Sequence, residues 1–222
     1  MNLPALFEGF RVDTVDSQQS MRVIIATSSS GKLLEFQEGL APLGWELLNL
    51  SSFQVAMPPE DGATYEENAL IKAASISLAT RTVALADDSG LEVEALGGAP
   101  GVYSARFGNK TSDLERNLYL LDNIKNVPAP RKAKFVSVIA LAHPDGFVES
   151  YRGEIEGVIL EGPRGEAGFG YDPLFLVPSL NKTFAELSVV EKRKISHRGR
   201  AIESLLKAYQ TGEPRREVSR LE

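Results

Sequence analysis

Residues 83–106, VALADDSGLEVEALGGAPGVYSAR, form the stretch on which the fold of this chain depends. The stretch opens with the apolar run 83–86, which predicts a β-strand buried on both faces. We expect that strand to end where DDSG (87–90) begins a loop, so that two carboxylates and a hydroxyl stand at its carboxyl end. Ligands collect at such strand ends in α/β sheets.

The adjacent carboxylates of Asp87 and Asp88 repel one another unless a cation or a hydrogen-bond donor satisfies them. A hard divalent ion with oxygen ligands would do so, and Mg²⁺ typically takes one or two protein carboxylates. A solvated turn is the alternative interpretation, because Asp, Ser and Gly are common turn residues and a four-residue motif has little specificity.

Length, charge and cysteine content narrow the function classes. The 222 residues suit one large domain or two small lobes, and the net charge of −6 argues against a nucleic-acid backbone as the main partner. The absence of cysteine excludes disulfides, thiolate zinc sites and cysteine nucleophiles. No apolar run approaches the ~18 residues of a membrane span, and the first residues do not resemble a secretory signal. We therefore expect a soluble, cytoplasmic protein.

A hydroxyl-rich loop, TSSSGK (27–32), lies between a predicted strand (22–26) and a predicted helix (33–40). This layout directs backbone N–H groups, hydroxyls and one lysine to a common point, which suits a phosphate. The loop is not a Walker A motif, because Ala26 replaces its first glycine and Leu33 its final Ser or Thr. A serine-rich helix cap with a solvated lysine is the alternative.

Thr64 and Glu67 have the spacing of a capping box at the start of a predicted amphipathic helix. That pattern is a structural reason for the glutamate. A helix N-terminus can also face a site, so Glu67 is a candidate metal ligand, although the pattern alone favours the capping box.

Two further segments contain candidate binding residues. The glycine-rich loop GPRGEAGFGYDP (162–173) could stack a flat ring on its aromatic side chains, and an ordinary packed loop is the alternative. Residues 192–198 hold four basic residues and a histidine, which form either a cationic patch or a solvated helix face.

The order of elements predicts a mixed α/β protein. Strands and helices alternate at first, a strand-rich middle follows, and the chain closes with helices. We expect one domain with two lobes around a cleft over residues 21–210, preceded by a disordered extension (1–20) and followed by a polar tail (211–222).

Five blocks of the chain together resemble one known family, the inosine triphosphate pyrophosphatases, or Ham1-like non-canonical purine NTP pyrophosphatases. The similarity extends from about Met21 to Tyr209. The blocks are ATSSSGK (26–32), TYEENALIKA (64–73), ADDSGLEVEALGGAPGVYSAR (86–106), AGFGYDP (167–173) and EKRKISHRGRA (191–201).

This resemblance implies an activity and an assembly. The activity is Mg²⁺-dependent hydrolysis of ITP, dITP and XTP to monophosphate and pyrophosphate, which clears deaminated purines from the nucleotide pool. The implied fold is an elongated mixed β-sheet with flanking helices and two lobes around a central cleft, and the implied assembly is a homodimer without nucleic-acid or membrane partners.

The resemblance also implies roles for individual residues. Asp88 is the general base and a metal ligand, Glu67 is a second metal ligand, and residues 27–32 hold the triphosphate. From the chemistry of phosphoryl transfer, Lys32 and Lys192 would neutralise the charge that grows on the departing pyrophosphate. The implied substrate-binding residues are Thr27, Ser28, Ser29, Ser30, Gly31, Lys32, Ser89, Phe169, Gly170, Tyr171, Asp172, Lys192, His197 and Arg198.

Base selection is a hydrogen-bonding problem at purine position 6. Donors such as Arg198 and a protonated His197 would pair with a 6-keto oxygen and would remain unpaired opposite the amino group of adenine. One departure concerns the phosphate loop, which in the family reads T-x-N-x-x-K. Ser29 takes the place of that asparagine, reaches less far and could engage phosphate through water.

Two rival functions are weighed against this one. The Maf-like pyrophosphatases share the fold style and act on other nucleotides, but the ISHR and FGYDP blocks favour the Ham1-like family. A non-catalytic nucleotide-binding regulator would keep the pocket without the chemistry, and the presence of Asp88, Glu67 and Lys32 argues against it.

Overall fold

The computed structural model describes residues 20–211 and contains a seven-stranded sheet in the order β2-β1-β3-β4-β5-β6-β7. The predicted N-terminal extension and polar tail lie outside the described residues, apart from Ser20 and Thr211. Within the described part of the chain, no helix is long and apolar enough to cross a membrane. The strands are β1 (Arg22–Ile25), β2 (Glu46–Asn49), β3 (Val83–Val93), β4 (Arg131–Ala142), β5 (Val148–Ile159), β6 (Phe175–Val177) and β7 (Lys182–Thr183).

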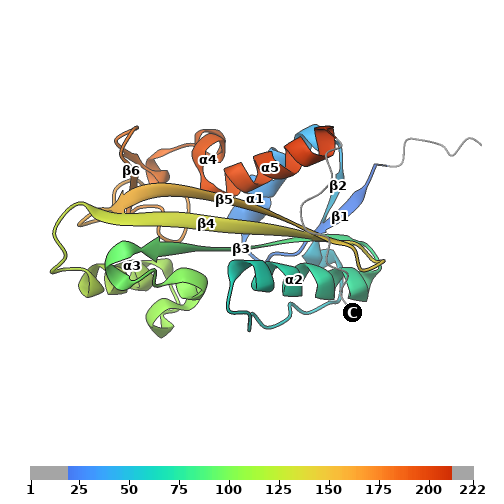
Figure 1. The fold of residues 1–222 in the computed structure, drawn as a ribbon, viewed down its shortest axis with the longest axis horizontal. Coiled ribbons are helices and arrows are strands. Elements are labelled where there is room, and N and C mark those ends of the chain that lie inside the picture. The colour runs from blue at the N-terminus through green and yellow to red at the C-terminus, as the bar shows by residue number, and fades with distance from the viewer. Residues whose placement is uncertain (1–19, 212–222) are drawn as a thin grey trace, which may run out of the picture.

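Helices lie on both sides of this sheet (Figure 1). Figure 1 shows α1, α4 and α5 on one side of the long strands and α2 on the other. The mixed α/β class and the flanking helices are thereby confirmed. The helices are α1 (Ser30–Leu40), α2 (Tyr65–Thr80), α3 (Asp113–Asn123), α4 (Val189–Ile195) and α5 (His197–Thr211), and a kinked 3₁₀ segment, η4 (Gly101–Asn109), precedes α3.

Three long antiparallel strands, β3, β4 and β5, give the molecule its elongated shape (Figure 1). At one end, β1 joins the sheet in parallel between β2 and β3. At the other end, the short strands β6 and β7 continue it in antiparallel fashion. The sheet is therefore mixed, with its parallel part confined to one end.

The prediction that the strand from Val83 ends at Ala86 is wrong. β3 continues to Val93, because β4 pairs with it throughout and places Asp87 opposite Ile139. The strand that does end is β1, whose pairing with β3 covers only the first part of that strand. The DDSG residues therefore lie in the middle of β3, at the open edge left where β1 stops.

Side chains along β3 alternate between the two faces of the sheet. Leu85 belongs to a buried apolar cluster with residues of α1 and α5, whereas Ala84 and Ala86 belong to a cluster with residues of α2. This alternation carries into the polar stretch, so Asp87 and Asp88 point to opposite faces.

Gly90 allows η4 to lie directly against β3. A Cβ atom at Gly90 would collide with the carbonyl oxygen of Gly101 and come within 2.7 Å of the Ser104 hydroxyl. That hydroxyl accepts a hydrogen bond from Leu91 N at 2.9 Å and donates one to Gly101 O at 2.7 Å. This close approach forms one wall of the cavity described next.

Candidate active site

A cavity of about 330 Å³ opens at the exposed edge of β3 and wraps around it. Residues from both faces of the sheet line it, so it brings together groups that strand alternation separates. The predicted site residues that line it are Ser29, Lys32, Asp88, Ser89, Phe169, Gly170, Tyr171, Asp172, Lys192, His197 and Arg198.

The remaining predicted residues lie nearby or elsewhere. Thr27, Ser28 and Ser30 line an adjacent cavity of about 420 Å³ at the ends of β1 and β2. Gly31 lies against the ring of Phe169, where a Cβ atom would come within 2.6 Å of ring carbon Cδ1. Glu67 does not line either of these cavities.

Asp87 is buried between two cations on the α5 side of the sheet. Its Oδ2 accepts hydrogen bonds from Nη2 (2.9 Å) and Nε (3.1 Å) of Arg198, and its Oδ1 lies 3.1 Å from Nζ of Lys32. Burial by itself would raise the pKa of Asp87, but the charges of Arg198 and Lys32 hold it well below its usual range. Asp87 is therefore an ionised anchor for both cations.

Glu35 of α1 links the phosphate loop to the cationic segment of the C-terminal helices. Its carboxylate forms an ion pair with Arg198 and lies 3.0 Å from Nζ of Lys192, which in turn lies 2.6 Å from Oδ2 of Asp172. Burial opposes the ionisation of Glu35, but the two cations lower its pKa. The result is one buried row of alternating charge: Asp172, Lys192, Glu35, Arg198, Asp87 and Lys32.

The sequence analysis missed Glu35. One local feature pointed to it. Glu35 precedes the buried Phe36 on an amphipathic helix, and a carboxylate at such a position needs a cation or a hydrogen-bond donor beside it.

Asp88 occupies a different environment on the α2 side of the sheet. Its carboxylate accepts hydrogen bonds from Nδ2 of Asn68 and from Ser89 N, both at 3.0 Å, and lies 3.8 Å from Nζ of Lys72. Burial raises the pKa of Asp88, and the charge of Lys72 only partly offsets this. A carboxyl group with a raised pKa in a cavity has the property required of a general base.

Lys72 and Glu60 are further residues that the sequence analysis missed. Nζ of Lys72 lies 2.6 Å from Oε1 of Glu60, so Lys72 stands between Glu60 and Asp88. Both carboxylates line the cavity. A lysine at a buried position of α2 was the signal for this cluster, whereas Glu60 lies in an irregular loop without a pattern.

Glu67 is exposed and forms the predicted capping box of α2. Its Oε2 accepts hydrogen bonds from Ala63 N (2.6 Å) and Thr64 N (3.3 Å), and its own N–H donates to Thr64 Oγ1. The capping interpretation is confirmed, and the metal-ligand role stays a prediction. Within residues 20–211, no group of three or more His, Asp or Glu side chains is arranged to hold a metal ion.

Ser29 likewise has a capping role. Its hydroxyl accepts a 3.4 Å hydrogen bond from Lys32 N at the start of α1, which is the alternative interpretation of the serine-rich loop. The same residue lines the cavity, so one hydroxyl at the N-terminus of α1 borders a space suited to a phosphate.

The surroundings of His197 disfavour the protonated form that the sequence analysis expects. Burial, together with the positive charges of Arg198 and Lys192, lowers its pKa well below 6.5. The imidazole stacks on Phe135 with ring centroids 4.6 Å apart. Its Nδ1 has no hydrogen-bond partner among the described residues. A neutral imidazole can still donate one hydrogen bond and accept one.

Most donors of Arg198 are already used. Of its five N–H groups, four point to Asp87, Glu35 and Ser89, which leaves one hydrogen on Nη1 for a ligand. Lys192 lies over the ring of Phe169, with Nζ 4.6 Å from the centroid. The aromatic residue of the predicted base-stacking loop and the cationic segment are thus in direct contact.

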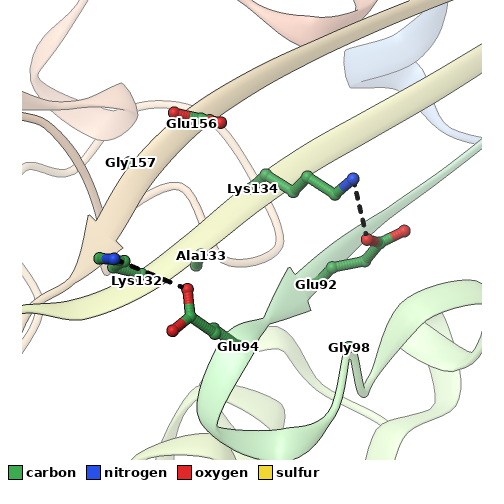
Figure 2. Close-up of a pocket in the computed structure, with 8 residues that line it drawn as sticks. All are labelled: Glu92, Glu94, Gly98, Lys132, Ala133, Lys134, Glu156 and Gly157. Carbon is green, nitrogen blue, oxygen red and sulfur yellow. Dashed lines mark ion pairs between the residues drawn. The ribbon is translucent and has the colours of Figure 1, made fainter.

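Figure 2 shows a separate cavity of about 430 Å³ on strands β3, β4 and β5. None of the predicted site residues lines it. Nζ of Lys134 lies 3.4 Å from Glu92, and Nζ of Lys132 lies 4.0 Å from Glu94, so both lysines of this cavity are paired with carboxylates. We therefore place the candidate active site in the cavity at the open edge of β3.

Comparison with known proteins identifies the family of this chain. The model of the Ham1 family matches residues 23–208, nearly the whole described chain. The chain belongs to the Ham1 family. The resemblance found in the five sequence blocks is thereby confirmed.

Relatives of this Ham1-family chain are similar over nearly their full length. A dITP/XTP pyrophosphatase of Thermus thermophilus is 59% identical over 205 residues, covering 92% of this chain and 99% of the relative. Another from Deinococcus radiodurans is 55% identical over 192 residues, covering 86% and 94%. A Ham1 protein structure from Coxiella burnetii matches with a TM-score of 0.79 and 42% identity, covering 86% of this chain and 99% of that one.

Proposed function

We propose that this Ham1-family protein is a nucleoside-triphosphate pyrophosphatase that hydrolyses dITP, XTP and ITP to monophosphate and pyrophosphate. The observation that supports this most directly is the single cavity shared by Asp88, whose pKa is raised, and the buried cations Lys192 and Arg198. Relatives named dITP/XTP pyrophosphatase, similar over nearly their whole length, support the same substrate class.

The proposed reaction uses the two ends of the cavity differently. Asp88 accepts a proton from the water that attacks the α-phosphorus. Lys32 and Lys72 neutralise the charge that develops on the departing pyrophosphate, because phosphoryl transfer depends mainly on positioning and charge stabilisation. Lys72 takes the role that the sequence analysis gave to Lys192, because Lys72 lies near Asp88 whereas Lys192 lies against Asp172 and Phe169. The hydroxyls of 27–30 and the N-terminus of α1 hold the phosphate chain.

We assign selection of the purine base to the end of the cavity that Phe169, Lys192 and Arg198 line. The free Nη1 hydrogen of Arg198 and the Lys192 ammonium donate to the 6-keto oxygen, and the ring of Phe169 supports the purine. The 6-amino group of adenine would leave these buried donors unpaired, which disfavours ATP. His197 contributes as a neutral group that accepts or donates a single hydrogen bond.

Mg²⁺ is the proposed cofactor, held by the carboxylates of Asp88 and Glu60. Both are hard oxygen donors that border the same cavity and lie on either side of Lys72. Glu67, which the family resemblance implies as a ligand, is exposed and already accepts two backbone N–H groups. When bound, Mg²⁺ would neutralise negative charge on phosphate oxygens.

We also propose that the protein acts as a homodimer in the cytoplasm, without nucleic-acid or membrane partners. Its acidic net charge is unfavourable for binding a nucleic-acid backbone. Analytical ultracentrifugation over a range of concentrations tests the assembly, and a single species with the mass of one chain would contradict it.

Product analysis with purified protein, Mg²⁺ and parallel samples of ITP, XTP, dITP, ATP and GTP tests the activity. We expect pyrophosphate and monophosphate from the first three nucleotides and little from ATP and GTP. Because guanine shares the 6-keto oxygen, GTP has to be excluded through its 2-amino group. Cleavage of other nucleotides would favour a Maf-like activity. Tight nucleotide binding without cleavage would favour a non-catalytic regulator. Ser29, which takes the place of the family's asparagine, would then be the first residue to test.

A further inference from the structure

Two side chains of α3 hold both backbone polar groups of Gly170. Gly170 N donates a 2.7 Å hydrogen bond to Oδ2 of Asp113, and Nδ2 of Asn117 donates a 3.0 Å hydrogen bond to Gly170 O. Asp113 and Asn117 are four residues apart and so lie on the same face of the helix. The peptide planes before and after Gly170 are therefore both fixed by one helix.

The loop needs this support at Gly170 in particular. Gly170 has φ +62°, in the left-handed region where glycine is freest, and it has no side chain to anchor it. Its neighbours have other attachments, since Phe169 N donates to Asp172 Oδ2 at 3.0 Å and the Tyr171 hydroxyl donates to Ser104 O at 2.9 Å. The planes fixed by α3 are those that join Phe169 and Tyr171 to Gly170.

The first turn of α3 is itself well anchored. Ser112 and Glu115 form a capping box at its start. Arg116 pairs with Asp113 and donates a 3.1 Å hydrogen bond from Nη1 to Lys110 O. Asn117 is buried, whereas the side chain of Asp113 reaches the cavity. A rigid helix end thus reaches the loop that supports the purine.

We infer that Asp113 and Asn117 are positioning residues for purine selectivity, an inference that rests on the proposed function. By fixing Gly170, they hold the ring of Phe169 beside Lys192, so that a stacked base meets the 6-keto donors in one orientation. Without them the loop samples other backbone conformations, and the hydrogen bonds that distinguish 6-keto from 6-amino purines lose their alignment. The proton transfer at Asp88 does not depend on them.

Two variants separate this role from simple packing. Asn117→Asp keeps the side-chain shape but cannot donate to Gly170 O, and Asp113→Ala removes the acceptor of Gly170 N–H. The matched controls are Leu118→Ala and Leu114→Ala, whose side chains are adjacent in sequence and exposed by 57% and 66%. Urea unfolding of each variant verifies that the protein remains folded at the temperature of the assays.

Hydrogen exchange at the Gly170 amide is measured first, in nucleotide-free protein. We expect both variants to exchange about tenfold faster or more, since each removes a hydrogen bond from the loop, and the controls to match the wild type. Dissociation constants for ITP and ATP follow, by calorimetry without added metal. We expect the preference for ITP to fall about tenfold in both variants, the equivalent of one well-placed hydrogen bond.

The outcomes are distinguishable. Unchanged exchange in both variants would overturn the inference, and so would faster exchange with an unaltered ITP-to-ATP binding ratio. A wild-type protein that neither binds these nucleotides in the calorimeter nor cleaves them in the presence of Mg²⁺ would refute the proposed function and the selectivity role with it, while the exchange data would still show whether α3 holds the loop.

Discussion

Asp87 and Asp88 are consecutive residues of one strand, yet their carboxylates contact different cations on opposite faces of the sheet. Asp87 pairs with Arg198 and Lys32, whereas Asp88 faces Lys72 and Asn68. The pKa of Asp87 is lowered and that of Asp88 is raised, because several buried cations surround the first and burial outweighs a single more distant cation at the second. Two carboxyl groups whose pKa values differ in this way are suited to an anchoring and a proton-accepting role, respectively.

Asp88→Asn should remove most turnover while leaving ITP binding in place. The amide keeps the shape of the side chain but cannot take a proton from water, so kcat is expected to fall by about 10²-fold to 10⁴-fold. Initial rates and ITP binding are measured on the same preparation. The control is Asp122→Asn, an exposed residue paired only with Lys125 on the surface. An unchanged kcat would exclude Asp88 as the base.

Glu60→Gln should raise the Mg²⁺ concentration that gives half-maximal activity by about tenfold or more, because it replaces a charged carboxylate ligand with a neutral amide. Glu67→Ala should leave that concentration unchanged and instead lower the free energy of unfolding by about 1 kcal/mol, through loss of the capping box. Mg²⁺ titration of initial rates and urea unfolding measure the two effects. If Glu67→Ala raised the Mg²⁺ requirement and Glu60→Gln did not, Glu67 and not Glu60 would be the metal ligand.

Arg198→Ala should lower the free energy of unfolding by about 3–5 kcal/mol, because Asp87 and Glu35 would both lose a buried partner. Urea unfolding measures this loss. The control is Arg22→Ala, which breaks an exposed pair with Glu46 and should change little. An equal loss of unfolding free energy in the two variants would mean that the buried row of charges does not stabilise the fold.

Loss of the Arg198 guanidinium should also lower the ratio of kcat/KM for ITP to kcat/KM for ATP. Arg198→Lys retains a charge for Asp87 but not the fork of donors, which makes it the better variant for this measurement. An unaltered ratio of the two kcat/KM values would place base selection elsewhere in the cavity.

Stability should fall as the pH decreases below about 6.5, in part because of His197. Its pKa is lowered in the folded protein by burial and by Arg198 and Lys192, with Asp87 acting only weakly in the opposite sense. The unfolded chain then binds a proton that the folded chain rejects, so His197 stabilises the fold fully above the unfolded pKa of about 6.5 and progressively less below it.

The measurement for this pH effect is the free energy of unfolding in urea at pH 7.5, 6.5 and 5.5 for the wild type and for His197→Gln. The slope difference should approach about 1.4 kcal/mol per pH unit below pH 6.5, the value for a single proton. Parallel pH profiles in the two proteins would mean that folding does not lower the pKa of His197.

Local features were predictable wherever neighbouring residues determine them. The capping box of Thr64 and Glu67 follows from a spacing of three residues, and the strand-loop-helix order around Ser29 follows from composition. Most residues of the candidate site were also found, because they fall within sequence blocks typical of one family. Glu60, Lys72 and Glu35 were not, since their partners are distant in sequence. Glu35 and Lys72 are marked only as charged residues at buried helix positions, and Glu60 has no local pattern at all.

The sequence by itself determined which residue types are available to the site, where helices begin, and which family the chain resembles. Only the tertiary structure decided that β3 continues past Ala86, since the strand that pairs with it, β4, follows only after η4 and α3 in the chain. It also decided that Asp87 and Asp88 face opposite sides and that the surroundings of His197 lower its pKa. Strand pairing and desolvation depend on what surrounds a residue in space, and residues far apart in sequence supply that surrounding.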